Sequence, residues 1–275
     1  MTPLLRLSGL TRRYAGLVAV DDVTLDVAPG GVHAVIGPNG AGKTTLFNLI
    51  SGLAAPSAGT IHFDGRDVTR LPAHRRAAAG LARTFQNIRV FAEMTVLENV
   101  LAGLHTRLSA SLPGIVLRLR RFRAEERDAV ERAVAALDLV GLADKAGLPA
   151  GALSYGDQRR LEIARAMAPR PRLLLLDEPA AGMNPAETEA LAALVRRLPS
   201  FGATVLLVEH DMGFVMGLSD RVTVLNFGRR IFEGAPATVR QEPAVIEAYL
   251  GPKVAARLAR QSASHGSASH GTPAA

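Results

Sequence analysis

The sequence predicts an α/β protein with a mostly parallel core sheet and a smaller antiparallel β subdomain formed by its first segments. Short apolar or alternating runs, separated by Asp-Asp and Pro-Gly-Gly turns, occupy much of residues 4–36. From residue 124 onward, runs with helical spacing alternate with strand-like runs. Such alternation is typical of a parallel sheet whose faces are covered by helices.

Individual elements follow from these patterns. The expected strands are short and apolar, and they cover 4–10, 23–27, 32–36, 60–63, 81–85, 173–177, 203–208 and 221–225. The strand at 60–63 runs into Asp64-Gly65, which is a hairpin signal. Helical spacing marks 124–139, 157–168 and 185–198.

The composition narrows the classes of function. The chain of 275 residues contains no cysteine, which excludes disulfides and thiolate metal sites. Its formal net charge is +7, from 32 Lys and Arg against 25 Asp and Glu, but aromatic residues make up only 4% and tryptophan is absent. A platform for stacking bases is therefore disfavoured, and no nucleic-acid partner is expected.

Hydrophobic residues make up 48% of the chain, yet no apolar run reaches the roughly 18 residues that mark a membrane span. The opening Met-Thr-Pro-Leu-Leu-Arg does not read as a secretory signal.

Two segments depart from the alternating pattern. Residues 104–123 combine Ser, Pro, Gly and Arg without a steady period, which predicts an insertion between helices. The tail at 251–275 contains the pentamer Ser-Ala-Ser-His-Gly twice, at 262–271. We expect it to be disordered, because its composition offers too little apolar surface to offset the entropy of ordering.

A glycine-rich loop follows the strand at 32–36 and precedes a helix expected at 46–51. It matches the G-x-x-x-x-G-K-[ST] pattern in the strand–loop–helix context that gives the pattern its meaning. Backbone N–H groups and the helix N-terminus would grip phosphate oxygens, with Lys43 on the β- and γ-phosphates and the Thr44 hydroxyl on Mg²⁺. The predicted nucleotide-binding residues of this loop are Gly37, Pro38, Asn39, Gly40, Ala41, Gly42, Lys43, Thr44 and Thr45.

The second half of the predicted ATP site follows a buried strand. Residues 172–179 read Arg-Leu-Leu-Leu-Leu-Asp-Glu-Pro, so an apolar strand brings Asp177 to its carboxyl end, where ligands gather in parallel sheets. Asp177 is expected to hold Mg²⁺, directly or through water. Glu178 is placed to orient and deprotonate the attacking water, a general-base role worth about 10²–10⁴ in rate.

Residues 153–158, Leu-Ser-Tyr-Gly-Asp-Gln, resemble the signature motif of the ABC ATPase family, and they lie shortly before the Asp177-Glu178 strand, as in that family. The family's motif contacts the γ-phosphate held by the other subunit, and the resemblance implies this contact for Ser154 and Gly156. A hydroxyl, a closely approaching backbone and a helix N-terminus suit an anion. The chain departs from the family's pattern at residues 155 and 157, which are Tyr and Asp.

Further segments resemble the family's motifs in the family's order. Gln86 resembles the glutamine of the Q-loop, which senses Mg²⁺ and the water and touches the membrane subunit. His210 resembles the switch histidine that bonds the γ-phosphate, and 181–185, Ala-Gly-Met-Asn-Pro, resembles the D-loop. Tyr14 resembles the aromatic residue that stacks on adenine, with an ordinary core or surface tyrosine as the alternative.

The resemblance covers about residues 4–250 and implies an ABC ATPase domain with a helical subdomain at about 87–168. Segments 83–91, 225–234 and 243–251 are most similar to ATPase subunits of branched-chain amino-acid importers. The resemblance therefore implies ATP and Mg²⁺ as ligands and a second ABC ATPase subunit, identical or related. It also implies two transmembrane permease subunits, indirectly a periplasmic substrate-binding protein, and a peripheral place at the cytoplasmic face of the inner membrane.

Other functions are compatible with parts of the pattern. A soluble ABC ATPase acting on DNA or ribosomes is disfavoured, because the chain has one cassette and no long heptad segment. A lipopolysaccharide-export ATPase shares several of the motifs, and a urea or amide importer also remains open. A regulatory nucleotide-binding module without turnover is disfavoured by Glu178 and His210.

Overall fold

The computed structural model describes residues 2–104 and 120–251. Nearly all of the tail predicted to be disordered, and most of the predicted insertion at 104–123, lie outside the described residues. α3 (Val96–Leu104) ends where the insertion was expected to begin, but α5 (Arg120–Val140) already starts at 120. The helix predicted at 124–139 therefore begins earlier than expected, at 120, because an existing helix extends by a turn at little cost even through charged residues.

The first part of the chain forms an antiparallel sheet in the strand order β2-β1-β4-β5. Its members are β1 (Leu5–Tyr14), β2 (Leu17–Val27), β4 (Ala58–Phe63) and β5 (Arg66–Asp67). β1 and β2 are longer than predicted, because residues 11–20 pair across their hairpin without an apolar alternation. The predicted hairpin at Asp64-Gly65 is confirmed by the pairing of β4 with β5.

The core sheet has the strand order β10-β9-β3-β8-β7-β6. Its members are β3 (Val32–Ile36), β6 (Leu81–Arg83), β7 (Leu173–Asp177), β8 (Thr204–Val208), β9 (Arg221–Asn226) and β10 (Arg229–Gly234). The strands pair in parallel except for β10, which returns antiparallel to β9 as an edge. The predicted mostly parallel sheet is confirmed, and β10 is a strand that the prediction omitted.

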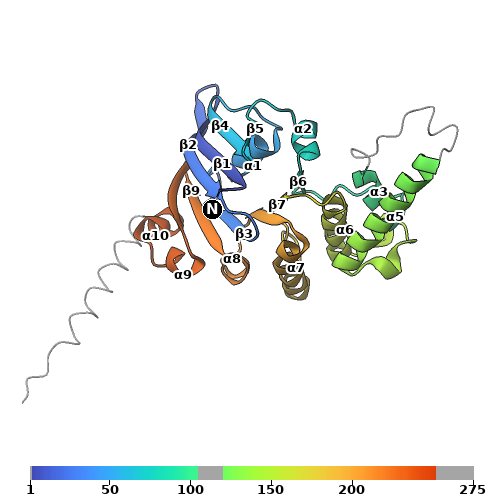
Figure 1. Ribbon diagram of the computed structural model, residues 1–275. Helices are drawn as coiled ribbons and strands as arrows, with labels where there is room; N and C mark the ends of the chain where they lie inside the picture. The colour runs from blue at the N-terminus through green and yellow to red at the C-terminus, as the bar shows by residue number, and fades with distance from the viewer. Residues whose placement is uncertain (1, 105–119, 252–275) are drawn as a thin grey trace, which may run out of the picture.

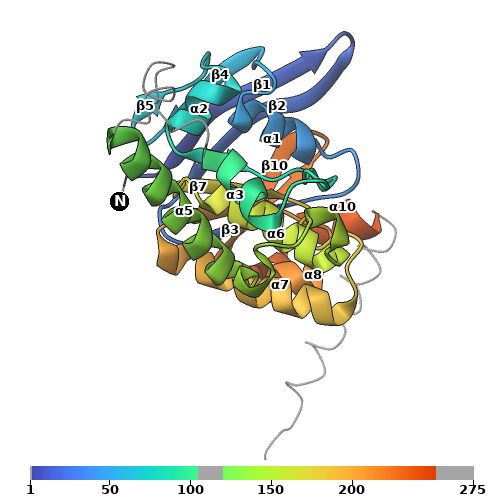
Figure 2. The same cartoon turned by 90° about the vertical axis from the view of Figure 1, so that its right-hand side faces the viewer.

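Helices cover both sheets and form a separate group at one side. The remaining helices are α1 (Lys43–Ser51), α2 (Ala73–Ala78), α6 (Tyr155–Met167), α7 (Pro185–Arg197), α8 (Met212–Leu218), α9 (Pro236–Val239) and α10 (Pro243–Leu250). α3, α5 and α6 pack on one another at the right of Figure 1, away from the antiparallel sheet. Figure 2 faces this group, with α5 nearest the viewer.

Two apolar clusters form the core, one on each face of the core sheet. Side chains alternate along a strand, so Leu174 and Leu176 of β7 face the cluster that contains α6, α7 and α8. Leu173 and Leu175 face the cluster under α1 and the antiparallel sheet. Burial of each such side chain contributes about 1.5–3 kcal/mol, which fixes the register of the sheet. The carboxyl ends of β3, β7 and β8 consequently meet at one edge.

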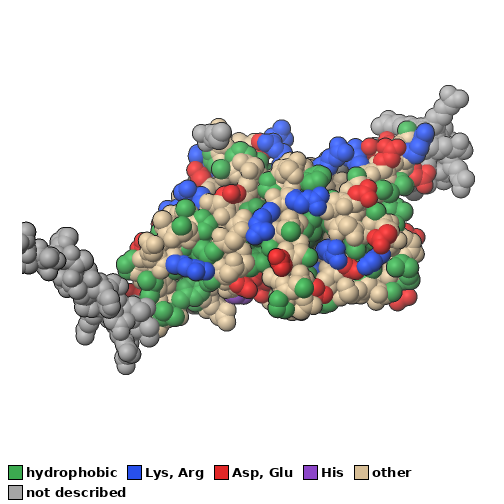
Figure 3. All heavy atoms as spheres, turned by 90° about the horizontal axis from the view of Figure 1, so that it is seen from below, with side chains coloured by type: hydrophobic (Ala, Val, Ile, Leu, Met, Phe, Trp, Pro, Cys, Tyr) green, Lys and Arg blue, Asp and Glu red, His purple; other side chains and the backbone are tan. Residues whose placement is uncertain are grey.

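The surface carries charges of both signs. On the face seen from below, Lys and Arg side chains are interspersed with Asp and Glu (Figure 3). Over residues 2–104 and 120–251, no helix combines the length and the apolar character that a bilayer span requires.

Candidate functional site

The glycine loop between β3 and α1 follows a path that requires glycine at two positions. Gly37 and Gly42 have φ values of +153° and +96°. A Cβ at Gly37 would lie 2.1 Å from the carbonyl oxygen of Leu225, and one at Gly42 would lie 2.3 Å from that of Ala19. α1 begins at Lys43, earlier than the predicted 46, because the left-handed Gly42 is its N-cap. The N–H groups of the first turn of α1, which have no partner within the helix, therefore lie directly at the end of the glycine loop.

Lys43 opens α1 and is only 5% exposed. Its Nζ donates hydrogen bonds to the carbonyl oxygens of Gly37 at 2.6 Å and Pro38 at 2.9 Å. Burial lowers the pKa of Lys43, while the carboxylates of Glu178 and Asp177 act in the opposite direction. An ammonium group among loop carbonyls and N–H groups is suited to binding phosphate oxygens.

Asp177 ends β7 and is buried beside Arg83, which ends the neighbouring strand β6. The Nη2 of Arg83 lies 2.7 Å from Oδ2 of Asp177, and both side chains are less than a tenth exposed. Arg83 also donates to Asn48 at 2.8 Å and to Ser51 at 2.9 Å, both in α1. This ion pair fixes the direction of the Asp177 carboxylate. Arg83 was not predicted from the sequence, although its place at a strand end just before Gln86 was an available signal.

Glu178 follows Asp177 with a φ of +47°, in the left-handed backbone region. A non-glycine residue in this region costs about 1–3 kcal/mol and often marks a functional site. Its Oε2 accepts a hydrogen bond from Nε2 of Gln86 at 3.0 Å, and its Oε1 lies 2.5 Å from Nε2 of His210. The structure thus brings together the three residues that were predicted to be catalytic.

Glu209, directly before His210, is a second buried carboxylate. It accepts hydrogen bonds from the backbone N–H groups of Ala180 at 2.8 Å and His210 at 3.1 Å. Burial raises the pKa of Glu209, although both hydrogen bonds oppose the rise. Glu209 therefore ties the end of β8 to the loop after Glu178. Glu209 was not predicted from the sequence, although an acidic residue near the end of an apolar strand is the same signal that identified Asp177.

A cavity of about 450 Å³ connects the glycine loop with the catalytic candidates. Loop residues 39–45 line it together with Gln86, Glu178 and His210. The predicted binding residues Gly37 and Pro38 lie outside this lining, where their carbonyl oxygens hold Lys43.

Apolar side chains close one side of this cavity. Leu17 and Val18, at the start of β2, and Phe227, in the turn between β9 and β10, form this wall. Tyr14 lies outside the wall at the end of β1, where the guanidinium of Arg12 stands 4.4 Å from the centre of its ring. This apolar wall could not be predicted from the sequence, because no pattern distinguishes an exposed apolar residue in a turn from ordinary surface residues.

Ser154 and Gly156 lie apart from the glycine loop. Ser154 is the N-cap of α6, and its hydroxyl accepts a hydrogen bond from the N–H of Asp157 at 3.2 Å. Both residues line a smaller cavity of about 230 Å³ beside α7. Gly156 permits close packing there, because a Cβ would lie 2.9 Å from Oε1 of Glu187. One chain therefore carries two separate halves of the predicted site.

The departures at residues 155 and 157 have partners within the chain. Tyr155 donates its hydroxyl hydrogen to the carbonyl oxygen of Ala181 at 3.0 Å. Asp157 is buried and pairs with Lys145 at 2.6 Å and with Arg160. Burial alone would raise the pKa of Asp157, but Lys145 and Arg160 hold it below its ordinary value. Asp157 thus fastens the start of α6 to the turn around Lys145.

The donor set fits a magnesium-bound nucleotide. Within the described ranges, no group of three or more His, Asp or Glu side chains is arranged to hold a metal ion. Mg²⁺ commonly takes one or two carboxylates together with substrate phosphates. The Thr44 hydroxyl and the Gln86 amide oxygen, which belong to residues lining the cavity, are hard oxygen donors of this kind. The Asp177 carboxylate is a third such donor, but Asp177 lies outside the lining and pairs with Arg83.

The glycine loop, the acidic pair after β7 and the histidine after β8 define a P-loop ATPase with an attached helical group. A family model described as "ABC transporter" matches residues 20–181, and one described as "Branched-chain amino acid ATP-binding cassette transporter" matches residues 229–251. The chain belongs to the ABC transporter family and is an ABC-type ATPase that binds ATP.

Named relatives are similar to this chain over nearly the whole cassette. The high-affinity branched-chain amino acid transport ATP-binding protein BraF of Pseudomonas aeruginosa is 49% identical over 90% of this chain and 98% of its own length. LivG of Escherichia coli strain K12, which carries the same description, is 46% identical with the same coverage. The ADP conformation of MJ1267, an ATP-binding cassette of an ABC transporter, matches with a TM-score of 0.80 and 32% identity. That match covers 92% of this chain and 100% of the other, which confirms the predicted cassette fold.

Proposed function

We propose that this chain is the ATP-hydrolysing subunit of an importer for branched-chain or related amino acids. The catalytic part is supported chiefly by one observation: Gln86 and His210 meet on the carboxylate of Glu178 at the cavity of the glycine loop. The cargo is supported by the similarity to BraF and LivG and by the family match at residues 229–251.

Each side chain has a role in this proposal. Lys43 and the N–H groups at the start of α1 bind the phosphates of ATP. Thr44, Asp177 and Gln86 would hold Mg²⁺, which supplies neutralisation of the phosphate charge. Glu178 orients and deprotonates the attacking water, and the contacts from Gln86 and His210 fix the direction of its carboxylate. His210 also bonds the γ-phosphate.

A second ATPase subunit, identical or related, completes the site. Ser154 and Gly156 line a cavity separate from their own glycine loop, so the proposed γ-phosphate contact has to be made to a partner. Two subunits then close head to tail, with each nucleotide between the loop of one and α6 of the other. ATP acts as a reversible part of the interface, and hydrolysis reopens it.

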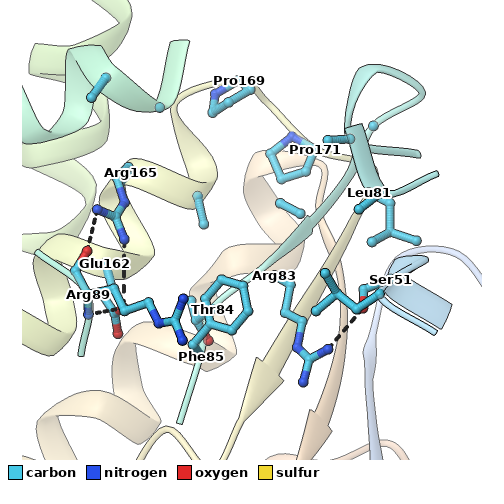
Figure 4. A pocket seen from close by; sticks show the side chains of 18 of the residues that line it. Ser51, Leu81, Arg83, Thr84, Phe85, Arg89, Glu162, Arg165, Pro169 and Pro171 are labelled. Carbon is cyan, nitrogen blue, oxygen red and sulfur yellow. Dashed lines mark hydrogen bonds and ion pairs between the residues drawn. The ribbon is translucent and has the colours of Figure 1, made fainter. Parts of the chain in front are cut away.

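A groove of about 510 Å³ supports docking to one of the two transmembrane permease subunits. It lies where β6 meets α3 and α6, and the side chains of Arg83, Arg89 and Arg165 stand around it (Figure 4). Thr84 and Phe85 line the groove immediately before Gln86. A permease segment bound here would therefore contact the residues that position the Q-loop and could displace its backbone. Such docking places the chain peripherally at the cytoplasmic face of the inner membrane, opposite a periplasmic substrate-binding protein.

Purification of the tagged chain from membranes of its source organism tests this function. Mass spectrometry is expected to identify two permease subunits and a second ABC ATPase. ATP hydrolysis by the reconstituted complex is expected to rise when its binding protein is loaded with leucine, isoleucine or valine. Stimulation only by urea or an amide, or recovery of lipopolysaccharide-export partners, would contradict the cargo. Recovery of no membrane subunit would contradict the transport role.

A further inference from the structure

Tyr155 is one of the two residues at which the chain departs from the family's signature motif. Its side chain points toward the D-loop of the same chain, residues 181–185. The ring packs against Gly182, and the hydroxyl donates to the carbonyl oxygen of Ala181 at 3.0 Å. The side chain remains 45% exposed, so this orientation is not imposed by burial alone. The backbone N–H of Ala181 in turn donates to the carbonyl oxygen of Glu178 at 3.2 Å. Tyr155 therefore holds the turn that carries the proposed general base.

Arg159 lies one turn further along α6 and contacts both Tyr155 and the Q-loop. Its Nη2 donates to the Tyr155 hydroxyl oxygen at 3.4 Å and to the carbonyl oxygen of Gln86 at 2.8 Å. Its Nη1 donates to the carbonyl oxygen of Phe85 at 2.8 Å. The guanidinium is fully buried, and Glu162 balances its charge at 2.9 Å. A planar guanidinium can reach all these acceptors at once, which an ammonium group cannot.

Glu162 extends the same contacts into the groove proposed for the permease. One of its oxygens pairs with Arg159, and the other accepts the backbone N–H of Arg89 at 2.9 Å. Figure 4 shows Glu162 at the wall of the groove, between Arg89 and Arg165. α6 therefore contacts the Q-loop backbone at four points, the carbonyl groups of residues 85, 86 and 89 and the N–H group of residue 89.

We propose that Tyr155 and Arg159 are positioning residues that form a relay between the two loops flanking Glu178. The relay runs from the Gln86 carbonyl through the Arg159 guanidinium and the Tyr155 hydroxyl to the Ala181 carbonyl. Because the Gln86 side chain also touches Glu178, the relay closes a ring of contacts around the carboxylate. A displacement of the Q-loop then moves the turn after Glu178 as well. This inference rests on the proposed function for the roles of Gln86 and Glu178.

Tyr155→Phe tests the relay, because it removes only the hydroxyl and keeps the ring. In the full-length chain, kcat for ATP hydrolysis is expected to fall about three- to tenfold, the loss typical of one or two hydrogen bonds. The KM for ATP is expected to stay within about twofold, since a positioning residue does not bind the substrate. A raised KM with unchanged kcat would assign Tyr155 to the nucleotide of a partner subunit and overturn the relay.

Hydrogen exchange without nucleotide tests the same relay independently of turnover. In Tyr155→Phe, amides of both 178–184 and 86–90 are expected to exchange faster, because the second segment is linked to Tyr155 through Arg159. Faster exchange confined to 178–184 would reduce Tyr155 to a local contact and overturn the relay. Unchanged exchange in both segments would overturn it too. These measurements retain their meaning even if the wild-type chain failed to bind ATP, an outcome that would contradict the proposed function instead.

Ser200→Ala is the matched control. It also deletes a hydroxyl that donates to a backbone carbonyl, that of Arg197 at 2.7 Å, but it lies just beyond the C-terminal end of α7. Its kcat and its exchange at 178–184 and 86–90 are expected to equal those of the wild type. Arg159→Lys preserves the positive charge beside Glu162 but removes the planar guanidinium with its several donors. Like Tyr155→Phe, it is therefore expected to raise hydrogen exchange at both 178–184 and 86–90. Wild-type exchange in a folded Arg159→Lys protein would overturn the relay.

Discussion

Nε2 of His210 lies 2.5 Å from Oε1 of Glu178, across the carboxyl ends of two adjacent strands. The register that pairs Asp177 of β7 with Val208 of β8 creates this proximity, because Glu178 directly follows β7 and His210 comes two residues after β8. The Nε2 of Gln86 donates a hydrogen bond to the other carboxylate oxygen of Glu178 at 3.0 Å. The carboxylate is thereby held from both sides on a backbone with a φ of +47°.

Glu178→Gln is expected to lower kcat for ATP hydrolysis by about 10²–10⁴, because the amide cannot accept the proton of the attacking water. ATP affinity is expected to stay within about threefold, since the amide retains the size of the side chain and removes only a charge. Steady-state turnover and nucleotide titration measure both quantities. The variant is also expected to accumulate as a closed dimer with ATP, visible by size-exclusion chromatography.

Glu131→Gln, an exposed change of the same kind on α5, is the control and should retain wild-type turnover. Near-normal turnover of Glu178→Gln would refute the general-base role. Loss of ATP affinity without a change in kcat would show instead that Glu178 contributes to binding.

Lys43→Ala is expected to weaken ATP binding by at least about 100-fold. The variant loses charge-assisted contacts to phosphate that are each worth about 1.5–3 kcal/mol. Titration with a fluorescent ATP analogue measures the change, and Glu178→Gln provides a variant that keeps the loop intact. Unchanged affinity in Lys43→Ala would refute the placement of the phosphates at this loop.

The motifs could be predicted from the sequence because each depends on neighbours along the chain. The glycine loop and the acidic pair after the apolar strand are local patterns, and their strands are fully buried, which makes the runs easy to recognise. The pairing of Arg83 with Asp177 could not be predicted, because the two residues are 94 positions apart and meet only through the pairing of β6 with β7. The contacts of Glu209 with Ala180 and of Tyr155 with Ala181 could not be predicted for the same reason.

The ends of several strands and helices also could not be predicted from the sequence. β10 and the end of β1 carry Arg and other polar residues, and the start of β2 is a continuous apolar run. These segments are stabilised by cross-strand pairing rather than marked by an apolar alternation. Helix starts depended on backbone geometry that composition does not reveal, as at Lys43, where the left-handed Gly42 sets the start.

Phe227→Asn is expected to stabilise the fold and weaken ATP binding at the same time. Phe227 and Gly228 form the two-residue turn between β9 and β10, with φ values of +46° and +78°, and Asn is preferred over Phe at such a position. Phe227 is 84% exposed, so little burial is lost. We expect a gain of about 0.5–1 kcal/mol in the free energy of unfolding.

The ring of Phe227 forms part of the cavity wall, so ATP affinity is expected to fall about two- to fivefold. Thermal unfolding and nucleotide titration read the two effects separately. Phe201→Asn is the control, because Phe201 is also exposed, at 52%, but lies outside both the positive-φ region and this cavity. A drop in stability for Phe227→Asn would show that the ring contributes more packing than its exposure indicates.

His33 of β3 makes folding stability depend on pH. It is 4% exposed, and its Nε2 lies 2.8 Å from the hydroxyl of Thr223 on β9. Burial lowers the pKa of His33 to about 4. The unfolded chain therefore takes up a proton at this residue below about pH 6.5 while the folded protein does not, so stability present above pH 6.5 is lost as the pH falls toward 4.

We expect His33 to account for a loss of about 2–3 kcal/mol in the free energy of unfolding between pH 7.5 and 4.5. His33→Gln keeps a polar side chain that can bond Thr223 but has no proton to gain, so its stability should fall less steeply over this range. Urea unfolding of both proteins at a series of pH values measures the difference in slope, in which the contributions of other groups cancel. Parallel profiles for His33→Gln and the wild type would mean that His33 is protonated in the folded protein, and that the contact with Thr223 tolerates the charge.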